Sequence, residues 1–170
     1  MTVDFFLLST VLAGCLIAAA AWDIATYTIP NPIQLILLAS FALFAVTSGM
    51  SAGVLTAHLA AGLMGLVMGF SLFAFGFVGG GDAKLFACVA LWFGLSDLLS
   101  YAITASIFGG ALTLGLLFFR KFPLPAVLAR QNWLLRLHDQ TAGIPYGVAL
   151  AAGSFAILPY TDVFRAGLAA

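Results

Sequence analysis

The stretch FVGGGDAKL at residues 77–85 separates two long apolar runs, and only here do three glycines, an acid and a base come together. An ionisable residue at the mouth of a membrane span is costly, and such residues mark functional sites. Glycines allow φ > 0 and let another chain approach closely. A helix beginning at Asp82 would stabilise the ionised carboxylate through its free N–H groups and its dipole. The alternative is a flexible loop whose aspartate merely caps a helix.

The composition predicts an integral membrane protein. Of the 170 residues, 64% are hydrophobic and 7% are charged, whereas a soluble domain carries about 25% charged residues. The net charge is zero, and no basic stripe could follow phosphates, so membrane lipid is an expected partner and nucleic acid is not. Cys15 and Cys88 lie in apolar runs without a CxxC motif, so neither a disulfide framework nor a zinc site is predicted.

The first half of the chain predicts three membrane spans, at roughly 20 residues per crossing. Phe5–Trp22 is the first span. A turn follows over Ile29–Pro32, because two prolines there disfavour helix. Ile33–Gly76 is long enough for two spans with a turn near Gly49. In the second of these, small residues recur every four positions and predict close helix packing: Ala61, Gly65 and Gly69. His58 is expected to be packed or hydrogen-bonded rather than a ligand.

The second half predicts three more spans, which gives an all-α bundle of about six transmembrane helices. Leu85–Phe119 is too long for one crossing, and a turn at Ser96-Asp97 would divide it into a short span and a longer one. Arg120–Thr141 is polar, with leucine, tryptophan and arginine mixed as in a helix that lies in the membrane interface. Ile144–Leu158 forms the last span.

The distribution of basic residues supports six spans. With Asp23 placed on the cytosolic side, only Arg165 lies outside, and five bases lie inside: Lys84, Arg120, Lys121, Arg130 and Arg136. This is the asymmetry that the positive-inside rule requires. A single crossing over Leu85–Phe119 would instead separate Lys84 from the later bases.

The same topology returns two aspartates to one face. Asp23 ends the first span and Asp82 starts the fourth, so both carboxylates are expected at the cytosolic boundary, although their lateral contact does not follow from the sequence. Two adjacent carboxylates cannot easily both ionise. Such a pair can activate water as a base and protonate the scissile peptide as an acid, without metal or cofactor. On a helix, Lys84 would point away from Asp82 and anchor the boundary.

These residues carry a resemblance to a known family. GGGD at residues 79–82 matches the GxGD motif of intramembrane aspartyl proteases. Together with Asp23 followed by Ile29-Pro30-Asn31, and with GIPYGVA at residues 143–149, the chain resembles the type IV prepilin peptidase family from about Asp23 to Gly153. The resemblance implies that Asp23 and Asp82 are catalytic. Other residues of the motifs would bind substrate or position loops: Gly79, Gly81, Lys84, Pro30, Asn31, Pro145 and Tyr146.

The resemblance also implies a substrate and a location. The substrate would be a prepilin with a short basic leader before an apolar helix, cleaved at the cytosolic face of the bacterial inner membrane. Only Asp23–Pro32 separates the first two spans, with no inserted CxxC-bearing domain. Residues 1–170 are therefore expected to form one transmembrane domain without N-methyltransferase activity, similar to the compact peptidases of Tad/Flp pilus systems.

Two alternatives remain open, and the oligomeric state is not predicted. A proton- or ion-coupled transporter could use Asp23 and Asp82 as relay groups. A non-catalytic assembly subunit could use them as helix caps. For the peptidase, the segment 79–81 is expected to be a flexible loop in which Gly81 needs a positive φ.

Overall fold

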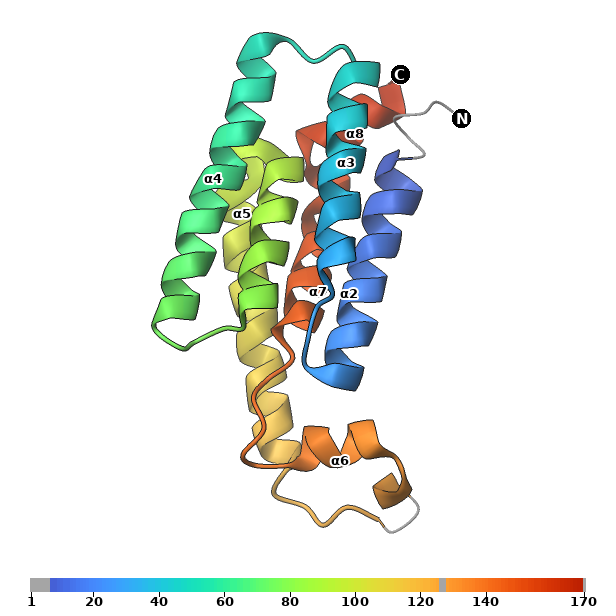
Figure 1. The fold of residues 1–170 in the computed structure, drawn as a ribbon, viewed down its shortest axis with the longest axis vertical. Helices are drawn as coiled ribbons and strands as arrows, with labels where there is room; N and C mark the ends of the chain where they lie inside the picture. Colours follow the sequence, from blue (N-terminus) through green and yellow to red (C-terminus); the bar gives the residue numbers. More distant parts are fainter. Residues whose placement is uncertain (1–6, 126–127, 170) are drawn as a thin grey trace.

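The computed structural model describes residues 7–125 and 128–169, and within them the protein is helical without strands (Figure 1). A π-helical turn at Leu7–Leu12 leads into the first α-helix. The α-helices are α2 Ala13–Thr26, α3 Asn31–Thr47, α4 Ala52–Ala74, α5 Gly80–Phe119, α6 Asn132–His138, α7 Tyr146–Ile157 and α8 Asp162–Ala169. Short 3-10 turns occupy Leu128–Arg130 and Leu158–Tyr160. The all-α prediction is confirmed; Phe5, the predicted start of the first span, lies outside the described residues.

Two of the described helices, α4 and α5, are long and apolar enough to cross a membrane. Shorter apolar helices cover Thr10–Thr26, Asn31–Thr47 and Tyr146–Tyr160. Large apolar side chains lie exposed on the outside of the bundle, including Val46 at 78% and Leu114 at 69% of their surface. An apolar exterior of this kind is typical of a surface that faces lipid or a partner rather than water.

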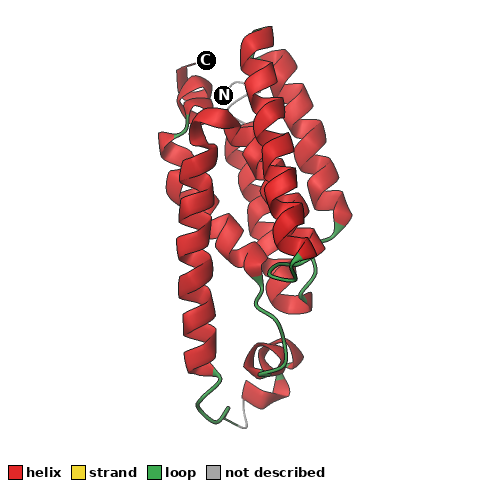
Figure 2. Ribbon diagram, turned by 90° about the vertical axis from the view of Figure 1, so that its left-hand side faces the viewer, coloured by secondary structure: helices red, strands yellow, loops and turns green. Residues whose placement is uncertain are grey.

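Helix α5 folds back on itself at Gly94. Gly94 has φ 77° and ψ 178°, which interrupts the helical conformation and which glycine alone adopts readily. The rings of Phe86 and Tyr101 stack at 4.9 Å, although a straight helix would hold them about 22 Å apart. Figures 1 and 2 show the two antiparallel arms, residues 80–93 and 95–119. The reversal predicted at Ser96-Asp97 therefore occurs at Gly94, because only this residue tolerates the required backbone angles.

Small residues let α4 pack directly along the first arm of α5. A Cβ atom on Gly65 would lie 2.7 Å from the Cβ of Ala90, and one on Gly69 would lie 2.9 Å from the Cα of Ala83. Ala61, in the same stripe, is fully buried. The predicted small-residue packing face is thus confirmed. His58 is also buried, with Nδ1 2.8 Å from the Leu91 carbonyl oxygen, which confirms its structural role.

A tryptophan ties the first arm of α5 to α3. Trp92 is fully buried, and its Nε1 donates to the Leu37 carbonyl at 3.0 Å. Its ring contacts Phe41 and Phe44, with centroids 5.7 and 5.4 Å away. This core fixes the arm whose first turn carries Asp82.

The bases gather at one end of the bundle. The α4–α5 loop, the C-terminal end of α2, the start of α7 and helix α6 share the lower end of Figure 1, whereas the α3–α4 turn and α8 lie at the other. Arg165 belongs to α8, so the predicted segregation of five bases from one agrees with this arrangement. The polar segment forms only the 3-10 turn and the short helix α6, with Trp133 and Leu135 exposed.

Candidate active site

Asp23 and Asp82 are both buried at the same end of the bundle, 3% and 8% exposed. They are close enough to interact electrostatically. Helix α2 continues for one turn beyond Asp23 to Thr26, and the positive φ of 57° at Tyr27 ends it. The structure thus brings together the two carboxylates whose lateral contact the sequence left open.

The start of helix α7 holds Asp23. Pro145 is buried and occupies the N-cap of α7. The N–H of Gly147, in the first turn, has no intrahelical acceptor and donates to Asp23 Oδ2 at 2.7 Å. The positive end of the helix dipole also favours a carboxylate there. The Pro145-Tyr146-Gly147 segment is therefore a direct neighbour of the first aspartate.

Asp82 is a helix cap through only one of its oxygens. Helix α5 begins at Gly80 rather than at Asp82, so Asp82 lies in the first turn, and its Oδ2 accepts from the Gly79 N–H at 3.0 Å. Its Oδ1 is buried and has no hydrogen-bond partner among the described residues. Leaving a buried acceptor unpaired costs about 1–3 kcal/mol, and such an exception calls for a functional explanation.

The prediction that residues 79–81 form a flexible loop with a positive φ at Gly81 is wrong. Gly80 and Gly81 are helical, Gly79 is the N-cap with φ −74°, and the glycines with positive φ are Gly49, Gly76 and Gly94. What Gly81 requires is space. A Cβ there would lie 3.2 Å from the Ile29 Cβ and 3.3 Å from the Ile29 nitrogen.

Ile29 fills the space between the two helix starts. It contacts Gly81 on one side, and on the other a Cβ on Gly147 would lie 2.9 Å from its Cδ1 and 2.9 Å from Asp23 Oδ2. Ile29 and Gly147 both belong to the sequence motifs, but the sequence alone predicts no role for either. Their importance is visible only once the three motifs lie together.

Lys84, Pro30 and Asn31 lie to one side of the aspartates. Pro30 is the N-cap of α3, and Lys84 Nζ donates to Asn31 Oδ1 at 3.1 Å. Both Lys84 and Asn31 line a separate cavity on the outside of α3, α4 and α5. Lys84 thus points away from Asp82, as predicted, and joins the head of α5 to the head of α3.

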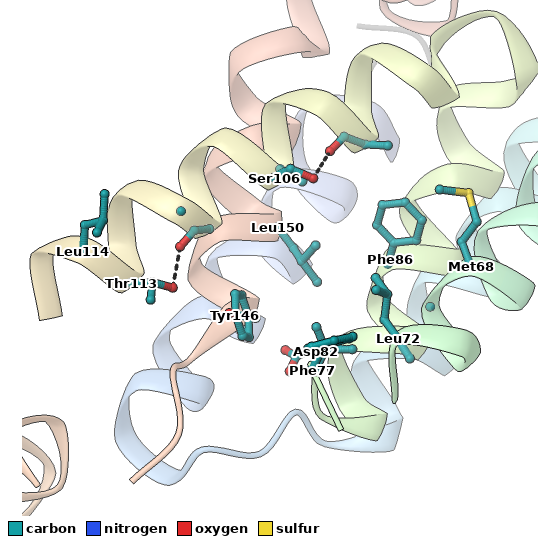
Figure 3. Close-up of a pocket in the computed structure, with 17 residues that line it drawn as sticks. Met68, Leu72, Phe77, Asp82, Phe86, Ser106, Thr113, Leu114, Tyr146 and Leu150 are labelled. Atoms are coloured by element: carbon teal, nitrogen blue, oxygen red, sulfur yellow. Dashed lines mark hydrogen bonds between the residues drawn. The ribbon is translucent and has the colours of Figure 1, made fainter. Parts of the chain in front are cut away.

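An open groove of about 560 Å³ adjoins Asp82 (Figure 3). It runs between α4, the α4–α5 loop, both arms of α5 and the start of α7. Thr113 and Ser106 line it, but their hydroxyls bond to carbonyls of their own helix, Gly109 and Ala102, at 2.7 Å each. The lining is therefore apolar except near Asp82 and Tyr146, and the Asp82 oxygens lie on the side nearest Tyr146 (Figure 3).

Arg120 holds the segment that leads into α7. It is 5% exposed, and its guanidinium donates three hydrogen bonds to backbone carbonyls. The acceptors are Leu137 at 2.8 Å, Ala142 at 3.1 Å and Gly143 at 2.9 Å. From the sequence, Arg120 counts only as one of the bases that indicate the orientation in the membrane. Its position directly at the end of an apolar run is the sequence feature that could have indicated a structural role.

The same segment contains a tight turn at Asp139. Its Oδ1 accepts from the backbone N–H and the hydroxyl of Thr141, both at 2.8 Å. These bonds to the charged form lower the pKa of Asp139. Asp139 is exposed. Among the described carboxylates, Asp23 and Asp82 are the buried ones.

No group of three or more His, Cys, Asp or Glu side chains that could hold a metal ion occurs within residues 7–125 and 128–169. Searches among curated proteins and among solved structures gave no match. The model of the type IV leader peptidase family matches residues 10–114, more than half of the chain. The match includes Asp23, Ile29-Pro30-Asn31 and residues 79–82, whereas the segment 143–149 lies beyond it. The chain belongs to the type IV leader peptidase family.

Proposed function

We propose that this protein is a membrane-embedded aspartic endopeptidase that removes the leader of type IV, Flp-like prepilins and so supports pilus assembly. Membership of the leader peptidase family makes it a protease and disfavours the transporter and the non-catalytic subunit. The aspartic chemistry rests on one observation. Two buried aspartates share a site, and Asp82 Oδ1 has no partner among the described residues.

The pair supplies an acid and a base for peptide hydrolysis. One carboxylate takes a proton from water as the water attacks the scissile carbonyl, while the protonated partner gives its proton to the carbonyl oxygen. When the tetrahedral diol collapses, the first group passes its proton to the leaving amine and the second takes one back from a diol hydroxyl, which restores the pair. Because the two groups titrate together, these roles belong to the pair rather than to either residue. The Gly147 N–H orients Asp23, and the unpaired Oδ1 of Asp82 is the oxygen left to bond water or substrate when either enters the site.

The membrane placement is part of the same proposal. Counting the two arms of α5 separately, six segments cross the bacterial inner membrane as one domain, and no methyltransferase domain is inserted between α2 and α3. The end that carries five of the six bases faces the cytosol, as the positive-inside rule requires. The basic leader of a prepilin would then reach Asp23 and Asp82 from the cytosol, while its apolar helix stays in the bilayer.

The direct test is to incubate the purified protein in detergent micelles with a leader-bearing Flp-like prepilin. Mass spectrometry of the products would map the cut. A single cut at the junction between leader and apolar helix is expected. An uncut prepilin, or cleavage inside the helix, would overturn the proposed function.

A further inference from the structure

We infer that the groove beside Asp82, which Gly110 helps to line, is the docking site for the apolar helix of the substrate. The inference rests on the proposed function, because it places the helix that follows the cleaved bond. It assigns one face of the protein to substrate recognition.

The groove suits an apolar helix. Its serine and threonine hydroxyls are bonded within their own helix, so an apolar partner would leave neither hydroxyl without a hydrogen-bond partner. In lipid, helices associate through close packing of small residues. The second arm of α5 presents such residues to the groove: Ala102, Ala105, Ser106, Gly109 and Gly110. Residues 102–114 of this arm would cover roughly 18 Å of a docked helix.

A second observation fixes the direction of the substrate. Asp82 is 8% exposed and lines the groove, and its Oδ1 has no hydrogen-bond partner among the described residues. A helix in the groove would therefore present the peptide bond before its first turn to the aspartates. Lipid chains could also fill an apolar groove, but they would make no use of the free carboxylate oxygen. A prepilin combines the apolar helix with the scissile bond.

Two glycines on the same arm allow a matched test. A Cβ on Gly110 meets nothing within 4 Å, so Gly110→Leu adds a side chain at the groove from a Cβ that has open space. Gly115 is also exposed and meets nothing within 4 Å, but it is not part of the groove lining. Gly115→Leu therefore adds the same bulk to the same helix, away from the proposed docking site.

The experiment measures prepilin cleavage by the wild type, Gly110→Leu and Gly115→Leu in micelles, after gel filtration and thermal melting have checked the fold. Gly110→Leu is expected to raise KM at least ~10-fold with little change in kcat, the pattern of lost uniform binding. Gly115→Leu should behave as the wild type. Equal KM values for the two variants would overturn the docking site and leave the groove to lipid.

A cross-linking measurement on the wild type covers the case in which Gly110→Leu misfolds. A prepilin carrying benzoylphenylalanine in its apolar helix is expected to cross-link to residues 102–114. Cross-links confined to the cavity around Lys84 would contradict the docking site while cleavage itself persisted. Failure of the wild type to cleave would instead overturn the proposed function, so the two failures are distinguishable.

Discussion

The backbone N–H of Gly147 donates to Asp23 Oδ2 at 2.7 Å and joins residues 124 positions apart. Asp82 in turn accepts from Gly79 at the start of α5, so each carboxylate accepts a hydrogen bond from a backbone N–H at the start of a helix. In a membrane protein, helix ends are where free backbone donors occur. The two helix starts, α5 and α7, therefore bring the aspartates to one end of the bundle.

The contact at Gly147 predicts that even a methyl group there is harmful. In Gly147→Ala the new Cβ would lie 2.9 Å from Asp23 Oδ2 and 3.1 Å from its Cβ. Displacing a catalytic group by about 1 Å can cost about 100-fold in rate, and a loss of that order in kcat is expected. Gly143→Ala is the control, because a Cβ there meets nothing within 4 Å. Equal prepilin cleavage by the two variants would show that Gly147 does not position Asp23.

The two glycines directly before Asp82 should differ in how well they tolerate a side chain. Gly81→Val places a branched side chain against the backbone of Ile29, since even its Cβ would lie 3.3 Å from the Ile29 nitrogen. In Gly80→Ala the Cβ would lie 3.5 Å or more from the Phe73 ring, an ordinary contact. Prepilin cleavage should fall strongly in the first variant and little in the second, with both accumulating in membranes. Similar cleavage by both would mean that the Gly81–Ile29 contact is dispensable.

Much of the architecture follows from the sequence. The turn at Gly49, the small-residue face of α4 and the structural role of His58 are set by local composition and spacing, and all three are confirmed. The sequence predicts the reversal in α5 two residues too late, because Ser96-Asp97 is the polar pair in this run. The backbone angles at the reversal require glycine, and the glycine is Gly94. An isolated glycine in an apolar run was the available signal.

The lateral arrangement of the site does not follow from the sequence. Counting crossings places Asp23 and Asp82 at one depth but leaves their separation open. Gly81 needs space because of Ile29, and Gly147 needs it because of Ile29 and Asp23, which are distant from these glycines in sequence. Arg120 likewise acquires its role from carbonyls that belong to a later segment.

Arg120 is expected to support activity from a distance, as a positioning residue. Arg120→Ala leaves three backbone carbonyls without their donor, and hydrogen bonds to charged groups contribute about 1.5–3 kcal/mol each. We expect a lower melting temperature and a kcat reduced by roughly 10-fold, because the approach of Gly147 to Asp23 loosens. Arg120→Lys should recover only part of the lost kcat and melting temperature, since an ammonium group lacks the fixed planar donors of a guanidinium.

The control for Arg120 is Lys121→Ala, which removes an exposed neighbouring charge. It should leave both kcat and melting temperature near those of the wild type. If Arg120→Ala lowers stability but keeps kcat unchanged, Arg120 holds the fold only and does not position the site.

The proposed orientation predicts which positions a membrane-impermeant thiol reagent can reach in intact cells. Thr26, Gln131 and Ser51 are exposed, whereas native Cys15 and Cys88 are buried. Thr26→Cys and Gln131→Cys, at the Asp23 end, should resist the reagent until the cells are opened. Ser51→Cys, at the opposite end, should react at once. Labelling in the reverse sense would contradict the cytosolic placement of the aspartates.

The central claim is that Asp23 and Asp82 together hydrolyse the peptide bond. Asparagine keeps the shape of each side chain but cannot exchange the proton, and acid–base catalysis contributes about 10²–10⁴-fold. The most direct measurement is therefore single-turnover cleavage of a leader-bearing prepilin by purified Asp23→Asn and Asp82→Asn, each checked for wild-type folding. Each single variant is expected to lose at least ~100-fold in rate. A folded variant that cleaves at near the wild-type rate would contradict the aspartic pair.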